Sequence, residues 1–185
     1  MSTSQEDLRR IALNEFATAG YAGTSLQRIA ELAGLSKASV LYHYGSKEQL
    51  LEAAIGPAID RMAEILATLE SHGLDEGRSD AFLEQFVDFL LEHRLEVHMF
   101  INQGPSLVDV PVIDRANALV LRLAEFFATT SSSVEEKMRF GIALGGAAYM
   151  LCTIQSLGLD APAIDETRAA LVTIMSQLLT PVRIP

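Results

Sequence analysis

The chain has 185 residues, of which 49% are hydrophobic and 21% charged. This composition is typical of a globular protein with a core, not of a disordered tail or a fibre. The formal net charge of −10 argues against wholesale wrapping by nucleic acid or adhesion to an anionic membrane. Residues 1–50 nevertheless balance their acidic and basic side chains, so the rest of the chain holds the whole negative charge.

Hydrophobic residues recur with a helical period, and no convincing run alternates with period two. We expect an all-α fold with helices near residues 4–19, 25–33, 37–43, 47–71, 80–102, 110–129, 134–157 and 162–179. Capping boxes predict three helix starts, because a hydroxyl residue is followed three positions later by Gln or Glu. They are Thr24 with Gln27, Ser46 with Gln49, and Ser133 with Glu136.

Residues 24–43 have the spacing of a DNA-binding helix-turn-helix, with the turn at Gly34. The helical period points Val40, in the second helix, at the apolar face of the first. The set left facing outward consists of Lys37, Ser39, Tyr42 and His43. These side chains can reach base edges or phosphates in a major groove, and Ala38 adds a small apolar surface. Lys47, in the first turn of the next helix, is suited to a phosphate, as is Thr24.

The run from residue 11 to residue 51 resembles the N-terminal region of the TetR family of transcriptional regulators. The resemblance rests on Phe16, Gly20-Tyr21, Thr24-Ser25, Ile29-Ala30, Ala33-Gly34, Ser36, His43, Tyr44, Ser46-Lys47-Glu48 and Leu50. It implies an all-helical homodimer with a three-helix DNA-binding domain (1–46) and a larger ligand-binding and dimerisation domain (47–185). It also implies contacts to double-stranded operator DNA from Thr24, Ser36, Lys37, Ala38, Ser39, Tyr42, His43 and Lys47. Leu41 stands where the family often has Tyr, so we expect Tyr42 to take over that backbone contact or the contact to be absent.

Aromatic and Met residues interleaved with polar ones predict a cavity for a mostly apolar small-molecule effector in the second domain. The predicted lining residues are Phe82, Phe86, Phe89, His98, Met99, Asn102, Gln103, Phe126 and Tyr149. Ordinary core packing explains the same pattern equally well.

Residues 140–159 carry no charged side chain, and Gly141 with Gly145 forms a small-residue motif. The many Gly and polar residues favour a packed bundle helix over a membrane span. We expect the last two helices to form the dimer interface as a four-helix bundle. The predicted interface residues are Gly141, Gly145, Ala148, Cys152, Ile164, Leu171, Met175 and Leu178.

Several classes are disfavoured by what the sequence lacks. We find no nucleophile elbow, phosphate loop, dinucleotide fingerprint or zinc-protease motif, so we expect no enzyme and no cofactor. His93 and His98 do not share a helix face, and we expect no metal. The single cysteine and the polar N-terminus favour the cytoplasm. The sequence therefore predicts a ligand-responsive repressor, and a helical-bundle enzyme or a dimeric interaction module without DNA binding are the alternatives.

Overall fold

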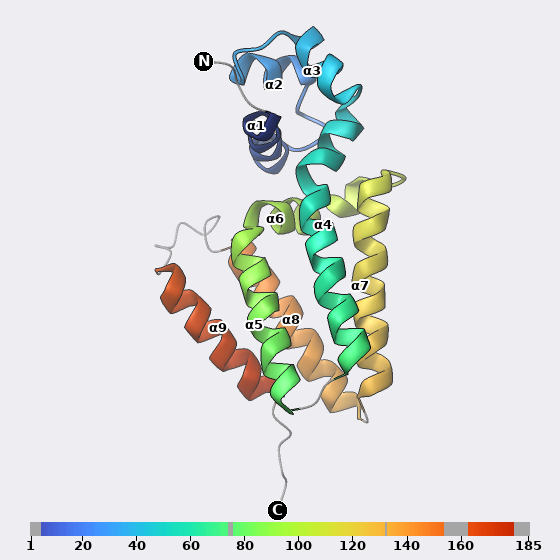
Figure 1. Ribbon diagram of the computed structural model, residues 1–185, viewed down its shortest axis with the longest axis vertical. Coiled ribbons are helices and arrows are strands. Elements are labelled where there is room, and N and C mark those ends of the chain that lie inside the picture. The colour runs from blue at the N-terminus through green and yellow to red at the C-terminus, as the bar shows by residue number, and fades with distance from the viewer. Residues whose placement is uncertain (1–4, 74–75, 132, 154–162, 180–185) are drawn as a thin grey trace, which may run out of the picture. The chain divides into compact units, whose positions relative to one another are not determined.

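The computed structural model (Figure 1) describes residues 5–73, 76–131, 133–153 and 163–179. Over these ranges the ordered elements are all helical, which confirms the predicted all-α fold. They are α1 (Gln5–Ala19), α2 (Leu26–Leu32), α3 (Lys37–Tyr44), α4 (Lys47–His72), α5 (Glu76–Glu92), α6 (Arg94–Gln103), the short 3-10 helix η1 (Gly104–Ser106), α7 (Pro111–Thr130), α8 (Val134–Thr153) and α9 (Ile164–Leu179). The ends predicted for the last two helices at residues 154–157 and 162 lie outside the described residues.

Two of the three predicted capping boxes have the expected helix-start bonds. The amide of Gln49 donates to Ser46 Oγ at 3.1 Å, and the amide of Glu136 donates to Ser133 Oγ at 3.1 Å. The third prediction is wrong by one residue, because Ser25 and not Thr24 caps α2. Ser25 Oγ accepts from the amide of Arg28 at 3.1 Å. The capping-box pattern favours Thr24, because Gln27 lies three positions later, whereas Ser25 is followed at that distance by Arg28.

The predicted helix over 80–102 is interrupted at His93, where α5 ends and α6 begins. The amide of His93 still bonds the carbonyl of Phe89 at 2.9 Å, and the two rings lie 5.2 Å apart. No Gly or Pro marks the break in this stretch. Its cause is therefore packing rather than local propensity, and periodicity alone could not have found it.

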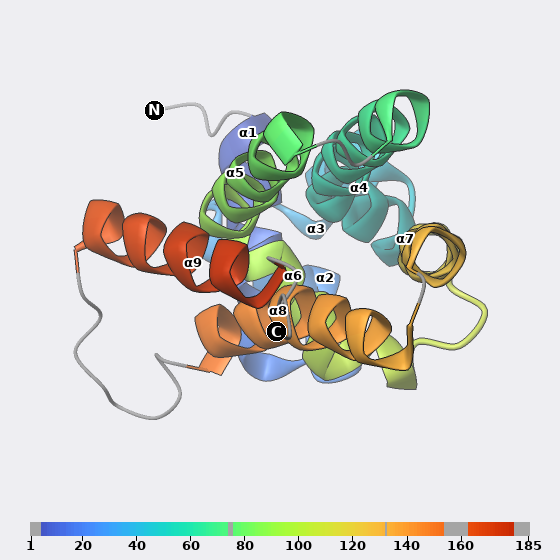
Figure 2. The same ribbon diagram turned by 90° about the horizontal axis from the view of Figure 1, so that it is seen from below.

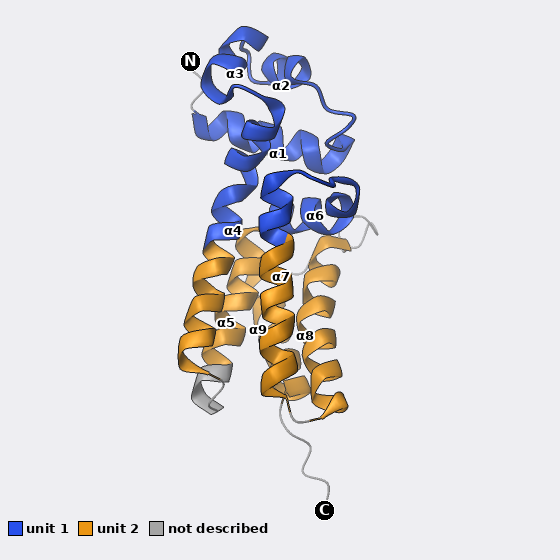
Figure 3. Ribbon diagram, turned by 90° about the vertical axis from the view of Figure 1, so that its right-hand side faces the viewer, with its two compact units in different colours: residues 1–60, 95–116 blue, residues 61–94, 117–185 orange. Residues whose placement is uncertain are grey.

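The chain divides into two compact units, coloured separately in Figure 3. The first comprises residues 1–60 and 95–116, and the second comprises residues 61–94 and 117–185. Helix α4 contributes to both units, and Pro57 lies inside it shortly before the division. These units are defined by packing, so the functional division predicted between residues 46 and 47 stays a prediction.

The first unit has a tight core where α1, α2 and α3 meet. Phe16 from α1, Ile29 from α2 and Val40 from α3 are fully buried. The predicted inward orientation of Val40 is thereby confirmed. The turn between α2 and α3 relies on Gly34, whose φ of +67° is a conformation that L side chains rarely adopt. This core fixes the direction in which the exposed face of α3 points.

In the second unit, α9 packs against both α5 and α8 (Figures 1 and 2). Phenylalanine rings pack against one another inside this unit. Phe82 lies 5.9 Å from Phe86 and 6.0 Å from Phe127, and the ring of Phe127 stacks on that of Phe140 at 4.0 Å. Ion pairs lie at the surface of this unit, and one of them joins Arg122 to Glu70 at 2.6 Å.

Within the described ranges, the helices are too short or too polar to cross a membrane. The same residues hold no group of three or more His, Cys, Asp or Glu side chains placed to bind a metal ion.

Candidate nucleic-acid interface

Helix α3 begins at a serine cap that orders its first turn. Ser36 Oγ accepts from the amide of Ser39 at 3.1 Å and lies 2.9 Å from Ser39 Oγ. Such a cap satisfies an amide that a helix start would leave without a partner. Ser36 and Ser39 therefore place two hydroxyl groups at the N-terminal end of α3. In the helix-turn-helix pattern, this end of the helix faces the DNA.

One face of α3 is open to solvent. Lys37 and Ala38 are exposed in the first turn, and His43 is exposed in the last. Tyr42 is 86% exposed, which is unusual for a large aromatic side chain. Its ring meets that of His43 edge-on at 5.5 Å. The outward orientation predicted from the helical period thus holds for Lys37, Tyr42 and His43, whereas Ser39 is only half-buried and its hydroxyl lies 2.9 Å from that of the cap.

The C-terminal end of α3 is tied to the beginning of α1. The hydroxyl of Tyr44 donates to the carbonyl of Gln5 at 3.1 Å, and the side-chain amide of Gln5 lies 3.5 Å from His43 Nδ1. Burial raises the pKa of Tyr44 above its ordinary value. Gln5 lies 38 residues from His43, so no local pattern links the two.

Thr24 has a different environment from the other predicted contacts. It is 3% exposed, and its hydroxyl donates to the carbonyls of Gly20 at 2.8 Å and Glu15 at 3.1 Å. The side chain thus closes the turn between α1 and α2. The contact to DNA predicted for Thr24 stays a prediction.

Lys47 lies at the start of α4, against the aromatic ring of Tyr21. Its Nζ is 4.2 Å from the ring centroid, a cation–π geometry. Burial lowers the pKa of Lys47, and the neighbouring Glu48 carboxylate opposes that shift. Burial, with Glu48 nearby, raises the pKa of Tyr21 to about 12. A cation in the first turn of a helix, beside amides that point outward, is suited to binding phosphate.

The residues predicted to line the effector cavity fall in both units. Phe82, Phe86, Phe89, Phe126 and Tyr149 belong to the second unit, and His98, Met99, Asn102 and Gln103 belong to the first. Met99 is fully buried. Gln103 bonds the turn after α1, as described below, and Asn102 donates to the carbonyl of His98 within α6 at 3.0 Å. That these residues surround one cavity stays a prediction.

The residues predicted for the dimer interface differ in exposure. Cys152 and Met175 are buried within the second unit, and burial raises the pKa of the Cys152 thiol. Gly141, Gly145 and Ile164 are exposed, and Ala148 is half-buried. Leu171 and Leu178 line an apolar groove of about 500 Å³ between α8 and α9.

The family model described as bacterial regulatory proteins of the tetR family matches residues 8–54. This match covers the N-terminal quarter of the chain. The resemblance predicted from residues 11–51 is thereby confirmed. The matched model describes regulatory proteins, and the curated relatives include HTH-type transcriptional regulators.

Among the relatives of this chain, the HTH-type transcriptional regulator RutR of Escherichia coli K12 is 40% identical over 60 residues, which cover 32% of this chain and 28% of RutR. The HTH-type transcriptional repressor AcnR of Corynebacterium diphtheriae is 29% identical over 106 residues, covering 57% of this chain and 54% of AcnR. The chain therefore matches about half or less of these relatives.

The fold extends the likeness over nearly the whole chain. The TetR-family regulator PfmR of Thermus thermophilus superposes with a TM-score of 0.70 over 96% of this chain and 99% of PfmR, at 18% identity. At this identity the likeness concerns the fold, and it includes the second unit that the family model does not match.

Proposed function

We propose that this chain is a cytoplasmic repressor that binds a pseudo-palindromic operator as a homodimer and is released by a mostly apolar small molecule. The observation that carries the proposal is the exposed face of α3, where Lys37, Ala38, Tyr42 and His43 point away from a fully packed core. A second helix of a helix-turn-helix with this exposure fits the major groove.

Each exposed group has a suitable partner in duplex DNA. Lys37 can donate to a guanine edge, and the ring of Tyr42 can pack on a thymine methyl or reach the backbone. Lys47 and the amides at the start of α4 can hold a phosphate. The balanced charge of residues 1–50, in a chain of net charge −10, favours approach to DNA by this end.

Dimerisation is supported by an apolar stripe on α8. Val134, Met138, Ile142 and Tyr149 are each more than half exposed, although they are large and apolar. A Cβ added at Gly145 would meet no atom within 4 Å, so this position offers room for a second helix. Large exposed apolar patches mark interaction surfaces. A second copy seated on α8 and on the groove beside α9 would bury this surface as a four-helix bundle.

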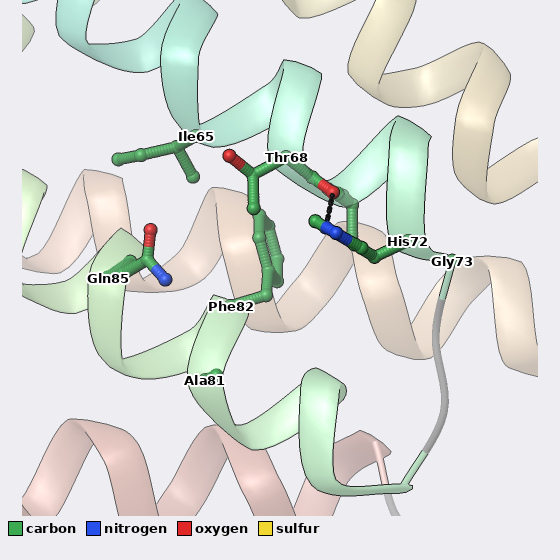
Figure 4. Close-up of a pocket in the computed structure, with 8 residues that line it drawn as sticks. Ile65, Thr68, His72, Gly73, Ala81, Phe82 and Gln85 are labelled. Atoms are coloured by element: carbon green, nitrogen blue, oxygen red, sulfur yellow. Dashed lines mark hydrogen bonds between the residues drawn. The ribbon is translucent and has the colours of Figure 1, made fainter.

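The cavity shown in Figure 4 is the proposed effector site. It has a volume of about 220 Å³ and lies between α4 and α5 in the second unit. Apolar walls come from Ile65, Leu69 and Phe82, of which Phe82 was predicted from the sequence. Polar groups come from Thr68, His72 and Gln85. This lining suits a small apolar molecule with one or two hydrogen-bonding groups.

An effector can release DNA only if it binds one arrangement of the two recognition helices better than the other. A coupling free energy of about 1 to 3 kcal/mol would change operator affinity roughly 5- to 150-fold. That range is sufficient for a switch.

The alternative is a dimeric interaction module without DNA binding. The apolar stripe on α8 supports it, because such a stripe serves any helical partner. The exposed lysine and aromatic side chains favour the repressor because they lie on the second helix of a helix-turn-helix, the helix that enters the major groove.

Filter binding to fragmented genomic DNA separates the two. The repressor retains a small set of fragments in the presence of excess non-specific competitor, whereas the module retains none. Light scattering on the retained complex should give two copies of the chain per site. A protein that is dimeric yet retains no fragment would contradict the proposal and support the module.

A further inference from the structure

The turns after α1 and α2 have the same backbone form but different closures. After α2, the amide of Leu35 donates directly to the carbonyl of Ala30 at 2.8 Å, across Gly34. This bond spans five residues and is the one that closes a Schellman turn, in which a residue of positive φ follows the helix. Gly34 supplies that φ, +67°.

After α1, the two corresponding backbone groups are bridged by a side chain from a distant part of the chain. Gly20 has φ of +82°, and the pair five residues apart is Tyr21 and Phe16. The amide of Tyr21 donates to Gln103 Oε1 at 2.7 Å, and Gln103 Nε2 donates to the carbonyl of Phe16 at 2.7 Å. Both bonds are part-buried. The primary amide of Gln103 therefore bridges the two backbone groups and closes the turn.

The turn held by Gln103 also supports the predicted phosphate contact. The ring of Tyr21 packs 5.2 Å from that of the buried Phe16, and Lys47 Nζ lies 4.2 Å from the centroid of the Tyr21 ring. A continuous set of contacts thus joins Gln103, at the end of α6, to the cation at the start of α4. All of these residues belong to the first unit.

We propose that Gln103 and Tyr21 are positioning residues for operator binding: Gln103 fixes the turn after α1, and the ring of Tyr21 then holds Lys47 toward a phosphate. This inference rests on the proposed function, because it concerns the same DNA interface. It assigns Gln103 a role in DNA affinity rather than in the effector cavity. Without the amide, the turn and the ring can move, and the lysine loses its fixed direction.

The salt dependence of operator binding tests this role. The logarithm of the binding constant falls as the logarithm of the salt concentration rises, and each phosphate contact adds about 0.9 to the steepness of this fall. One contact therefore changes affinity about eightfold for each tenfold change in salt concentration. Lys47→Ala should reduce the magnitude of this slope by about 0.9 for each protomer. Gln103→Leu removes both hydrogen bonds, and we expect it to lower the slope in the same direction and to weaken binding several-fold. Asn117→Leu, an amide lost from α7 in the second unit, is the matched control and should leave the slope unchanged.

The double variant separates positioning from simple destabilisation. If Gln103 acts through Lys47, then Gln103→Leu should have almost no further effect on the slope in the Lys47→Ala background. A purely structural residue would lower the melting temperature, leave the slope as in the wild type, and add its effect to that of Lys47→Ala. That result would overturn the inference.

Substitutions of Tyr21 keep the test independent of Gln103. Tyr21→Phe retains the ring and should retain the wild-type slope, whereas Tyr21→Leu should lower it as Lys47→Ala does. Equal slopes for both variants would contradict the inference. A wild-type protein that binds no duplex would instead overturn the proposed function itself, so the two failures are distinguishable.

Discussion

The guanidinium of Arg168 binds the carboxylate of Asp88 with two hydrogen bonds. Nε donates to Oδ1 at 2.6 Å and Nη2 donates to Oδ2 at 3.0 Å, joining α9 to α5. The hydrogen bonds from Arg168 hold the pKa of Asp88 below its ordinary value, against the opposing effect of burial. Two-point geometry makes this pair more specific than an ordinary surface ion pair.

This pair predicts a pH dependence of stability. Because the pKa of Asp88 is lower in the folded state, its stabilisation is full above the unfolded pKa and is lost as the pH falls through the folded pKa. Asp88→Asn should lower the free energy of unfolding by about 0.5 to 1 kcal/mol at pH 7, since the pair is partly exposed. Urea unfolding at fixed protein concentration should show this difference shrinking as the pH is lowered through the folded pKa.

Glu84→Gln is the matched control, because Glu84 makes one longer contact with Arg168, at 3.4 Å. Its effect at neutral pH should be the smaller of the two. An Asp88→Asn difference that stayed constant as the pH fell through the acidic range would be inconsistent with the pair.

The two serine caps predict separable effects on stability and on DNA binding. Ser25→Ala and Ser36→Ala each remove a side chain that accepts from an amide in the first turn of its helix, and each should cost about 1 kcal/mol. Only Ser36 lies at the predicted groove-facing end of α3. Ser36→Ala should therefore also weaken operator binding beyond the loss seen with Ser25→Ala. Equal operator affinities for the two variants would remove Ser36 from the interface.

The exposed stripe on α8 predicts a dimer that a single charge disrupts. Gly145→Arg places a cation where the protomer has space, so the fold should persist while the partner helix is repelled. We expect monomers by light scattering at micromolar concentration and a loss of operator affinity. Ala67→Arg, at an exposed position of α4, is the control and should stay dimeric. A wild-type protein that is monomeric in the same measurement would refute the proposed interface.

If the cavity between α4 and α5 binds the effector, then a larger side chain in its wall should block the response. Compounds that raise the melting temperature of the wild type should no longer do so in Ala81→Leu, because the larger side chain fills part of the cavity. Ala128→Leu, at an exposed position of α7, should respond as the wild type does. Hits that stabilise Ala81→Leu as much as the wild type bind elsewhere.

Local patterns predicted the first unit well because its architecture follows from short-range chemistry. The buried position of Val40 follows from helical spacing, and the exposure of Tyr42 follows from the same period. The start of α4 at Ser46 follows from its capping box. Each of these features depends on residues within a few positions of one another.

The features that were missed depend on contacts across the chain. Gln103 looked like a polar group for a cavity, yet it bonds Tyr21, 82 residues away. Thr24 was predicted to cap a helix, but its hydroxyl is used inside the turn, and its predicted phosphate contact stays a prediction. The break at His93 carries no local signal at all. In each case tertiary packing decides among side-chain roles that the local sequence leaves equivalent.

The central claim is that α3 reads base sequence, and selection of operators from random duplexes tests it most directly. The wild type should recover a pseudo-palindrome whose half-sites lie about one helical turn, ~34 Å, or a multiple of it apart. Lys37→Ala should recover sites with a changed preference at one position of each half-site, at a cost of about 1 to 3 kcal/mol for the original base pair. If the wild type and Lys37→Ala recovered the same sequences with equal affinity, or if neither enriched any sequence, the assignment of α3 as the recognition helix would be contradicted.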